Sequence, residues 1–490
     1  MSKSNRRKFV KKSGLGVLSV LTAPRLLAAP FGGPQNTALQ PSKGVFFTNG
    51  FKTAEVGKDS VVLWTRLCGQ EFPQPVRHQR QEKVFRHPID FDEEQPVSEM
   101  DGAVSGATGL VRVRILDSAD QTVWSSDWQQ ALPQDDYTVK IPVTGLQPAT
   151  MYRVYWEAKP IEGGLIRKEE GSFSTAPPEQ QPVPVRFTTS TCQYFWSFDD
   201  ERRGFQTYDS MRRLEPDFFV QTGDYIYYDK PGPLAKNLEK ARHKWHAMDG
   251  WLSLRDFYRQ VPLYMVKDDH DLLKDDMYRG KGPYGDLTFD DGLKLWYENV
   301  PIQGKPYRTL RWGKDLQVWM VEGREYRSEN TMEDGPEKTI WGEEQKLWFR
   351  ETVNASDATF KILITATPVV GPDRDNKTDN HANKSFQHEG NWLRKYLSAQ
   401  KNMFVVNGDR HWQYVSKDIE TGLMEFGSGP VSDCHSQGWK EGDLRPEHRF
   451  LRLKGGFLSI SVSRASGKPN IRFEHRDVLG EVVHEEVFEA

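Results

Sequence analysis

This chain of 490 residues lacks the features that mark several classes of protein. Three cysteines are too few for a disulfide framework, and their odd number leaves at least one of them outside any disulfide. Basic residues are not in excess, because 66 Lys and Arg stand against 69 Asp and Glu, and a net charge of −3 gives no reason to expect a nucleic-acid partner. No later segment approaches the ~20 apolar residues of a membrane-spanning helix, so we expect no membrane span once the leader described below is removed.

Aromatic side chains make up 12% of the chain, and 15 of them are Trp. This content is typical of a well-packed globular protein rather than a disordered one. Because 490 residues are too many for one ordinary domain, we expect two domains. Whether Cys68 pairs with Cys434 stays open at this point.

Residues 1–29 are predicted to be a targeting segment. Arg6 and Arg7 are followed by an apolar run at 15–23 and by small residues at Ala28 and Ala29. This order resembles a twin-arginine export signal, and the apolar run is too short to span a bilayer. A basic disordered tail is the alternative. We therefore expect the twin-arginine export machinery as a partner and a periplasmic or secreted location.

Residues 44–176 are predicted to form a small β-sandwich. Short strands between turn-rich links are expected at 61–64, 111–115 and 137–141. The stretch 145–155 resembles the tyrosine corner of fibronectin-III and other immunoglobulin-like sandwiches. The polar stretch 74–105 is predicted to be a long loop, and the proline-rich stretch 177–182 a domain boundary. No chemistry-bearing residues cluster here, which favours a structural role.

From residue 183 to 490 the pattern changes to strands that alternate with helical stretches, which is typical of an α/β domain. Buried strands are expected at 185–191, 218–222, 261–266, 316–321, 361–365 and 403–406. Apolar residues at helical spacing predict helices around 205–214 and 392–397. The tail from 457 to 488 returns to strands, which we expect to close the second sheet.

Four of these strands end in residues that can bind a metal. They present Cys192, then Asp224 with Tyr227, then the cluster Asp268-Asp269-His270-Asp271, and last Asp409 with His411. Ligands in α/β folds sit beyond the carboxyl ends of strands. Taken singly, each has an ordinary explanation as a capped strand, a core residue or a solvated loop. Together, so many carboxylates on one face would repel each other unless cations held them.

The candidate ligands divide by hardness. Thiolate, phenolate and imidazole suit a ferric ion, while carboxylates suit a hard divalent cation such as Ca²⁺. Another divalent pair, such as zinc or manganese, is the alternative. A thiol and a phenol buried without a metal would stay protonated, so their pairing at one strand edge favours iron.

The order of these motifs resembles the alkaline phosphatase D (PhoD-like) family of calcineurin-type metallophosphoesterases. Two further stretches, 322–327 and 342–345, resemble that family's Asp-Thr-Arg-x-Tyr-Arg and Gly-x-Glu-Gln segments. The resemblance covers nearly the whole chain. It implies an α/β fold: a four-layer αββα sandwich at 183–490, preceded by an immunoglobulin-like domain at 44–176 and a twin-arginine signal.

The resemblance also implies a role for each residue of the motifs. Asp224 would bridge two metals, and His270 would act as general acid for the departing alkoxide. Arg324 lies in the Asp-Thr-Arg-like stretch and is implied to be catalytic. The implied ligands of the iron are Cys192, Tyr227 and His411. Those implied for the calcium are Asp269 and Asp409, with Asp275 as an additional contact.

The activity that the resemblance implies is hydrolysis of phosphate monoesters, diesters or both by an exported metal-dependent phosphoesterase. Two cations would clamp the phosphate, acidify a bridging water to the attacking hydroxide and stabilise charge on the attacking and leaving oxygens. A phospholipase D-like phosphodiesterase could use the same site. A catalytically decayed surface protein that binds a glycan or cell-wall polymer is the alternative from another class, and the intact ligand series argues against it.

Three departures from the family pattern leave substrate preference and the number of calcium ions open. Lys267 stands in place of Trp, Glu322 in place of Asp, and Asp275 in place of Asn. Lys274 is a candidate to balance the extra charge of Asp275. We expect the walls of the substrate pocket to come from loops at 230–252 and 372–390.

Overall fold

The computed structural model describes residues 44–79, 90–464 and 467–490, so the targeting segment predicted at 1–29 lies outside the described residues. The largest sheet has nine strands in the order β21-β20-β19-β9-β10-β11-β1-β2-β6. Its strands are β1 Phe51–Ala54, β2 Ser60–Arg66, β6 Thr138–Thr144, β9 Val185–Ser190, β10 Phe218–Gln221, β11 Leu263–Met265, β19 Phe457–Ser463, β20 Asn470–Arg476 and β21 Val482–Glu489. At its centre β9, β10 and β11 run parallel, so their carboxyl ends meet at one edge.

A second sheet has seven strands in the order β12-β13-β14-β15-β17-β16-β18. They are β12 Arg308–Trp312, β13 Leu316–Met320, β14 Phe360–Thr365, β15 Met403–Asn407, β16 Gln413–Lys417, β17 Met424–Ser428 and β18 His448–Arg452. The two sheets pack face to face, because alternate strand residues point into a shared apolar layer. Phe218 and Val220 meet Ile362 and Ile364 in that layer.

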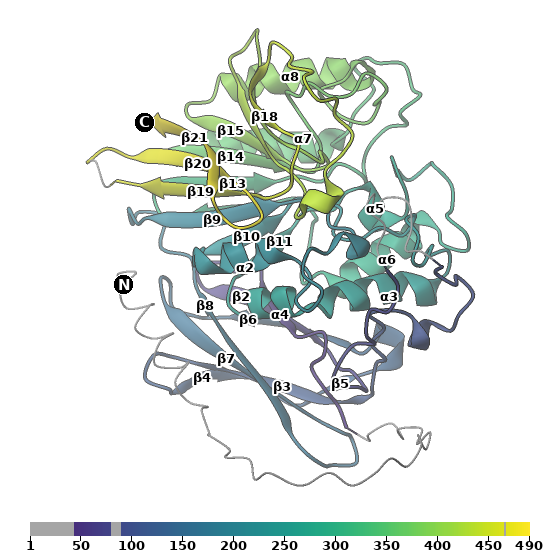
Figure 1. Ribbon diagram of the computed structural model, residues 1–490. Coiled ribbons are helices and arrows are strands. Elements are labelled where there is room, and N and C mark those ends of the chain that lie inside the picture. Colours follow the sequence, from purple (N-terminus) through teal and green to yellow (C-terminus); the bar gives the residue numbers. More distant parts are fainter. Residues whose placement is uncertain (1–43, 80–89, 465–466) are drawn as a thin grey trace, which may run out of the picture. The chain divides into compact units, whose positions relative to one another are not determined.

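Helices cover the outer face of each sheet (Figure 1). The nine-stranded sheet carries α2 Gln206–Arg213, α3 Leu238–Asp249, α4 Leu252–Tyr258 and α6 Phe289–Asn299. The seven-stranded sheet carries α7 Gly342–Ala355 and α8 Gln387–Ser398. Shorter helical turns are α5 Asp269–Leu272, η1 Val97–Glu99, η2 Pro133–Asp135, η3 Phe195–Ser197, η4 Lys384–Phe386 and η5 Asp433–His435. This arrangement is the predicted four-layer αββα sandwich.

The N-terminal strands form a β-sandwich that shares a layer with the central sheet. Its outer layer holds β3 Gly109–Leu116, β4 Thr122–Ser125, β5 Gln129–Ala131, β7 Met151–Lys159 and β8 Arg167–Ser174. Its inner layer is β1, β2 and β6, which join the nine-stranded sheet where Ala54 pairs with Leu263. At the predicted tyrosine corner, the Gln147 backbone N–H donates to Tyr152 Oη over 2.8 Å. The immunoglobulin-like assignment and the boundary at 177–182 remain predictions.

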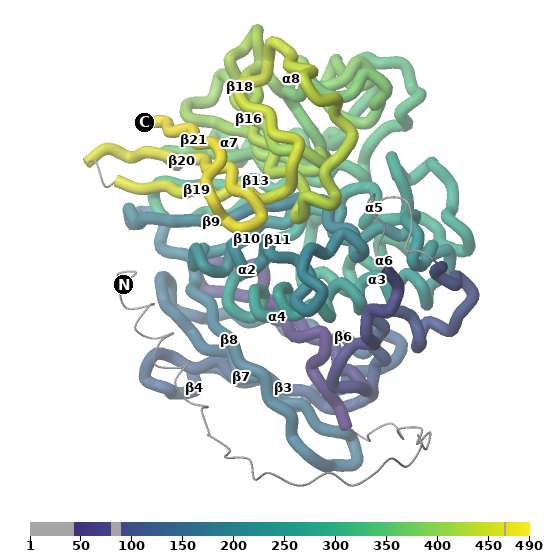
Figure 2. Tube along the Cα trace, viewed as in Figure 1, coloured from purple at the N-terminus to yellow at the C-terminus, as the bar shows by residue number. Residues whose placement is uncertain are grey.

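The C-terminal strands lie in a different sheet from the one predicted. The sequence predicts that the tail at 457–488 closes the second sheet, and this is wrong, because β19 pairs antiparallel with β9 and β20 and β21 follow outward (Figure 2). Without that pairing, β9 would leave a row of backbone N–H and C=O groups unpaired at a sheet edge. Leu458 and Ile460 of β19 also point into the apolar layer between the sheets.

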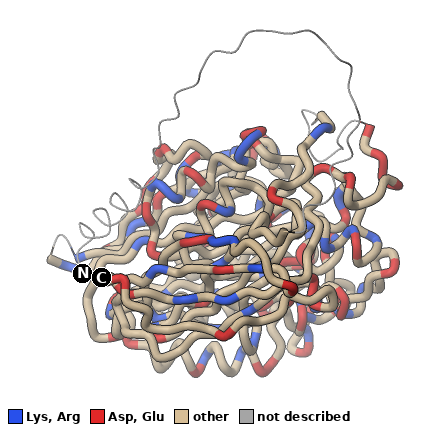
Figure 3. Tube along the Cα trace, turned by 90° about the horizontal axis from the view of Figure 1, so that it is seen from below, with Lys and Arg blue, Asp and Glu red and all other residues tan. Residues whose placement is uncertain are grey.

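Basic and acidic residues are interspersed along the trace (Figure 3). Within the described ranges, none of the helices is both long enough and apolar enough to cross a membrane. Cys68 and Cys434, whose pairing the sequence left open, are both free thiols.

Candidate metal centre

The site residues lie where the carboxyl ends of the two sheets come together. Each of three strand ends turns through a residue with left-handed backbone: φ is 50° at Cys192, 57° at Asp224 and 59° at Asp409. Such conformations cost about 1–3 kcal/mol each in a residue other than glycine and are typical of functional sites. Gly408 allows the approach, because a Cβ there would lie 2.1 Å from the Thr222 carbonyl oxygen. The Asp409 backbone N–H donates to Thr191 Oγ1 over 3.2 Å, which links the ends of β15 and β9.

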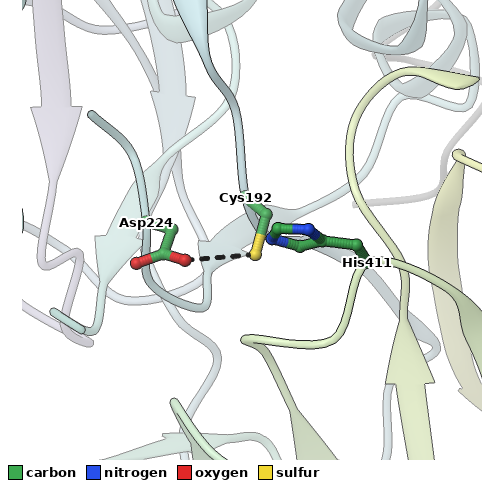
Figure 4. A group of neighbouring side chains, drawn as sticks. All are labelled: Cys192, Asp224 and His411. Atoms are coloured by element: carbon green, nitrogen blue, oxygen red, sulfur yellow. Dashed lines mark hydrogen bonds between the residues drawn. The ribbon is translucent and has the colours of Figure 1, made fainter. Parts of the chain in front are cut away.

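A first group joins a thiol, a carboxylate and an imidazole. The ligand atoms of Cys192, Asp224 and His411 all lie within 4.8 Å of one another, and they converge from three separate segments (Figure 4). Cys192 Sγ lies 3.4 Å from Asp224 Oδ2, and Tyr227 Oη donates to the same oxygen over 3.0 Å. Tyr227 Oη is also 3.4 Å from His411 Nε2. The structure thus brings the three residues that the resemblance implies for iron together with Asp224, the implied bridge.

Burial controls the protonation of this group. It raises the pKa of the Cys192 thiol and of the Tyr227 phenol well above their ordinary values, and the Asp224 carboxylate raises both further. Burial, together with His435, lowers the pKa of His411 well below its ordinary value, so His411 is neutral. A neutral imidazole is the form that binds a metal. The thiol and phenol need a cation to lose their protons here.

A second group consists of carboxylates. The ligand atoms of Asp224, Asp269 and His270 lie within 4.8 Å of one another, and so do those of Asp224, Asp268 and Asp409. Asp224 Oδ1, Asp268 Oδ2 and Asp269 Oδ1 are buried, and none has a hydrogen-bond partner within the described residues. Buried carboxylate oxygens without partners are costly, and a hard cation would satisfy them. These residues therefore fit a metal site with oxygen ligands.

Asp275, predicted as a further metal contact, lies at the rim of this group. Its side chain is 60% exposed, and its ligand atom lies within 4.8 Å of those of Asp269 and Asp276. Lys377 Nζ lies 3.4 Å from Asp275 Oδ1 and 3.0 Å from Asp276 Oδ1. Lys274 instead donates to the Pro283 carbonyl oxygen, so the suggestion that Lys274 balances Asp275 is wrong. Lys377 is the lysine that pairs with Asp275.

His270 is held by a carboxylate outside the predicted motifs. Its Nδ1 lies 2.8 Å from Asp229 Oδ1, and its ring packs 4.4 Å from the ring of Tyr227. Burial would lower the pKa of His270, but Asp229, Asp269 and Asp224 together raise it to about 10. Nδ1 is engaged by Asp229, and Nε2 lies on the side of the rim, 3.9 Å from Asp275 Oδ1.

Asp271 anchors the loop that carries Asp224. Its carboxylate accepts the backbone N–H groups of Asp224 at 2.8 Å, Tyr225 at 2.7 Å and Asp268 at 2.9 Å. Burial is the main reason that the pKa of Asp271 is raised to about 7. Asp271 therefore positions the metal ligands, and it is absent from the groups of side chains that could hold an ion among the described residues.

Arg324, predicted to be catalytic, is 1% exposed and lies within an ion-pair network. Its Nε donates to Asp268 Oδ1 over 2.6 Å, and its Nη2 donates to Asp379 Oδ2 over 3.2 Å. Arg324 thereby orients Asp268 beside the carboxylate group. A role in the reaction itself stays a prediction.

Several residues of the site escaped the sequence analysis. They are Asp229, Lys377, Asp379 and His435. Each belongs to a loop or short turn distant in sequence from the residue it contacts, so no spacing rule points to it. For a different supporting contact the sequence did carry a signal. Lys267 and Glu322 both depart from the family pattern, and they carry opposite charges.

These two departures are coupled in the structure. Lys267, 2% exposed, lies with its Nζ 2.5 Å from Glu325 Oε1 and 3.6 Å from Glu322 Oε1. Glu322 also accepts the backbone N–H groups of Arg324 and Glu325 at 2.8 Å and 2.7 Å. The lysine thus neutralises two glutamates behind the loop that carries Arg324.

We expect Lys267→Met to lower the free energy of unfolding by about 3–5 kcal/mol, because it leaves Glu322 buried without its cation. Urea unfolding of the metal-free protein measures this change. Adding Glu325→Gln to Lys267→Met should cost less than the sum of the two single changes. Lys274→Met, at a partly exposed lysine, is the control and should change stability by less than about 0.5 kcal/mol. Equal effects at the two lysines would contradict the coupling.

Comparison with known proteins shows the family of the chain. A family model described as PhoD-like phosphatase matches residues 187–454, more than half of the chain. The chain is 22% identical over 540 residues to alkaline phosphatase D of Bacillus subtilis (strain 168). The alignment covers 96% of this chain and 84% of that protein.

Solved structures show the same fold. A structure titled "Structure of PhoD" matches with a TM-score of 0.69 at 17% identity, over 93% of this chain and 90% of that one. Purple acid phosphatase PPD1 from yellow lupin (Lupinus luteus) seeds matches with a TM-score of 0.59 at 11% identity, over 90% and 74% of the two chains.

Proposed function

This chain belongs to the PhoD-like phosphatase family, and from that premise we propose that it is an exported, metal-dependent phosphoesterase acting on phosphate monoesters, diesters or both. One observation carries the proposal. A thiol, a phenol and an imidazole lie close to Asp224, and so do carboxylate oxygens without hydrogen-bond partners in the described chain. Two donor sets of different character side by side suit a pair of unlike cations, and a metal pair suits phosphate chemistry.

The proposed ligands follow from the two groups. Ferric iron would be held by Cys192, Tyr227 and His411, and Ca²⁺ by Asp269 and Asp409, with Asp224 shared between them. Asp275 is proposed as an additional calcium contact at the rim, and zinc or manganese is the alternative pair. When bound, the ions would supply Lewis acidity toward the phosphate and lower the pKa of bound water.

The remaining work falls to the chain's own residues. His270 is proposed to give the proton on Nε2 to the departing alkoxide, while Asp229 holds Nδ1 and fixes the ring. Arg324 is proposed to hold Asp268 in place rather than to contact the substrate, because it is buried and paired on two sides. Asp271 keeps the Asp224 loop in the geometry that the metals need.

The test is an assay of metal-replete protein with bound iron, calcium, zinc and manganese quantified. We expect hydrolysis of p-nitrophenyl phosphate, bis-p-nitrophenyl phosphate or both, lost after chelation and restored by the same metals. Choline release from phosphatidylcholine vesicles tests the phospholipase D-like alternative. Stoichiometric metal without hydrolysis of any ester would favour the decayed binding protein instead.

Export is proposed to depend on Arg6 and Arg7 together. We expect the double variant Arg6→Lys, Arg7→Lys to accumulate inside the cell as folded, unprocessed protein, because the twin-arginine machinery reads the paired arginines. Fractionation with an immunoblot measures this, and Lys11→Arg serves as a charge-preserving control. Normal secretion of the double variant would refute the twin-arginine assignment.

A further inference from the structure

His435 lies beside the proposed iron ligands but outside every sequence motif. It ends the short turn η5, which follows β17, and its side chain is fully buried. Its Nε2 lies 3.2 Å from Tyr227 Oη, and its ring centroid lies 4.4 Å from that of His411. Ser432 holds the turn by accepting the Cys434 backbone N–H over 3.1 Å.

The tautomer of His435 is fixed by a backbone group. The Tyr194 backbone N–H donates to His435 Nδ1 over 3.2 Å. Because an amide nitrogen can only donate, Nδ1 carries no proton, and the proton of the neutral ring sits on Nε2. Ser197 Oγ is 3.3 Å from the same Nδ1, but its hydroxyl donates to the Tyr194 carbonyl oxygen over 2.6 Å. The Nε2–H group therefore faces the Tyr227 oxygen as a donor.

The same tautomer separates His435 from the metal ligands. A protonated Nε2 has no free lone pair, and the lone pair of Nδ1 is taken by the Tyr194 amide. His411 differs, because its ligand atom joins those of Cys192 and Asp224 within 4.8 Å. His411 and His435 thus lie side by side, with different roles open to them.

We propose that His435 is a positioning residue that donates a hydrogen bond from Nε2 to the Tyr227 phenolate when iron is bound. The inference rests on the proposed iron site. Tyr227 Oη donates to Asp224 Oδ2 over 3.0 Å, and the His435 Nε2–H group faces the same phenol oxygen over 3.2 Å from another side chain. A hydrogen bond to the charged form favours it, and such outer partners tune the metal through its ligand.

The test compares two variants at this one position. His435→Phe removes both the acceptor for the Tyr194 amide and the donor to Tyr227, whereas His435→Gln keeps an N–H donor near the place of Nε2. After reconstitution with ferric iron, we expect the phenolate-to-iron absorption band of His435→Phe to lie at longer wavelength than in wild type. A phenolate without the donor releases an electron to iron at lower energy. His435→Gln should stay close to wild type.

Controls separate the outcomes. His243→Phe, at a buried histidine on α3, should leave the band unchanged. Equal band positions in His435→Phe and wild type would overturn the inference, and so would equal shifts in the phenylalanine and glutamine variants. No band dependent on Tyr227 in ferric wild type would remove Tyr227 as an iron ligand and this inference with it, while ester hydrolysis measured in parallel reports on the phosphoesterase proposal.

A second measurement uses the wild-type protein alone, so it does not depend on the folding of a variant. Nitrogen NMR of the metal-free wild-type protein, labelled with ¹⁵N-histidine, reports which ring nitrogen of His435 carries the proton. We expect the Nε2–H tautomer. A proton on Nδ1 alone would overturn the inference.

Discussion

Asp224→Asn is expected to reduce ester hydrolysis by at least about 10³-fold while leaving the protein folded. Asp224 is the residue common to both groups of ligand atoms, and it is 1% exposed. A neutral amide bridges two cations poorly, and a lost metal costs several kcal/mol of transition-state stabilisation. About 4 kcal/mol corresponds to that loss in rate. The measurement is kcat/KM on an aryl phosphate, with bound metals quantified in each protein.

In the metal-free protein, by contrast, the same substitution is expected to keep or raise the stability of the fold. Burial raises the pKa of Asp224 well above its ordinary value, with His270 opposing and Asp269 adding to the shift. A carboxyl with a raised pKa in the folded state costs stability as pH rises above its ordinary pKa, and asparagine removes that cost. Metal-free Asp224→Asn should therefore melt at or above the temperature of wild type at neutral pH. Added metal should stabilise wild type, by about 2.7 kcal/mol at a hundred times its Kd, and the variant far less.

Asp217→Asn is the matched control for this prediction. Asp217 precedes β10 at the end opposite to Asp224, and its carboxylate accepts the Arg186 backbone N–H over 2.8 Å. An amide oxygen can keep that bond, so activity and metal content should stay near wild type. An Asp224→Asn protein that keeps activity within a few-fold of wild type would remove the bridging role.

The candidate ligands could be predicted because each follows directly after a buried strand. An apolar run such as 218–222 predicts a core strand without any knowledge of its neighbours, and parallel strands bring their carboxyl ends to one edge. The structure accordingly gathers Cys192, Asp224 and His411. Their individual roles stay predictions, since proximity alone does not show what each one binds.

The residues that support the ligands could not be predicted in the same way. Asp271 could be seen as one more acidic residue of a motif, yet its bonds from the backbone N–H groups of Asp224, Tyr225 and Ile226 exist only because two strand ends lie side by side. The contact between Lys377 and Asp276 joins residues that are about a hundred positions apart in the sequence. Such contacts depend on tertiary packing, which local patterns do not encode.

The helix α3 and one sheet connection are elements that the sequence analysis missed for identifiable reasons. Residues 230–252 were expected to be a pocket-wall loop, but they contain α3. Its polar residues obscured an apolar stripe of Ala241, Trp245 and Met248 at helical spacing, all buried. Asn237, which accepts the Lys240 backbone N–H over 2.9 Å, is a start signal present in the sequence. The pairing of β1 with β11 involves a single residue pair, too short to leave a pattern.

His270→Ala is expected to reduce hydrolysis of alkyl phosphates by about 10²–10⁴-fold and that of p-nitrophenyl phosphate by less than about tenfold. An alkoxide is a poor leaving group and needs a proton as its bond to phosphorus breaks, whereas a nitrophenolate leaves without one. His270 is suited to supply the proton, because Asp229 holds its Nδ1 at 2.8 Å. The measurement is kcat/KM over a series of phosphate esters whose alcohols differ in pKa, so that the slope against leaving-group pKa steepens in the variant.

Two controls decide whether such a loss reflects proton donation. His270 packs 4.4 Å from the Tyr227 ring, so iron content and the visible spectrum of His270→Ala must match wild type before the kinetics are compared. Asp229→Asn keeps the imidazole but weakens its orientation, and it should show a smaller loss with the same dependence on the leaving group. Equal losses on alkyl and nitrophenyl esters in His270→Ala would exclude His270 as general acid. The histidine would then act before the bond to the leaving group breaks, by holding Tyr227 or the phosphate in place.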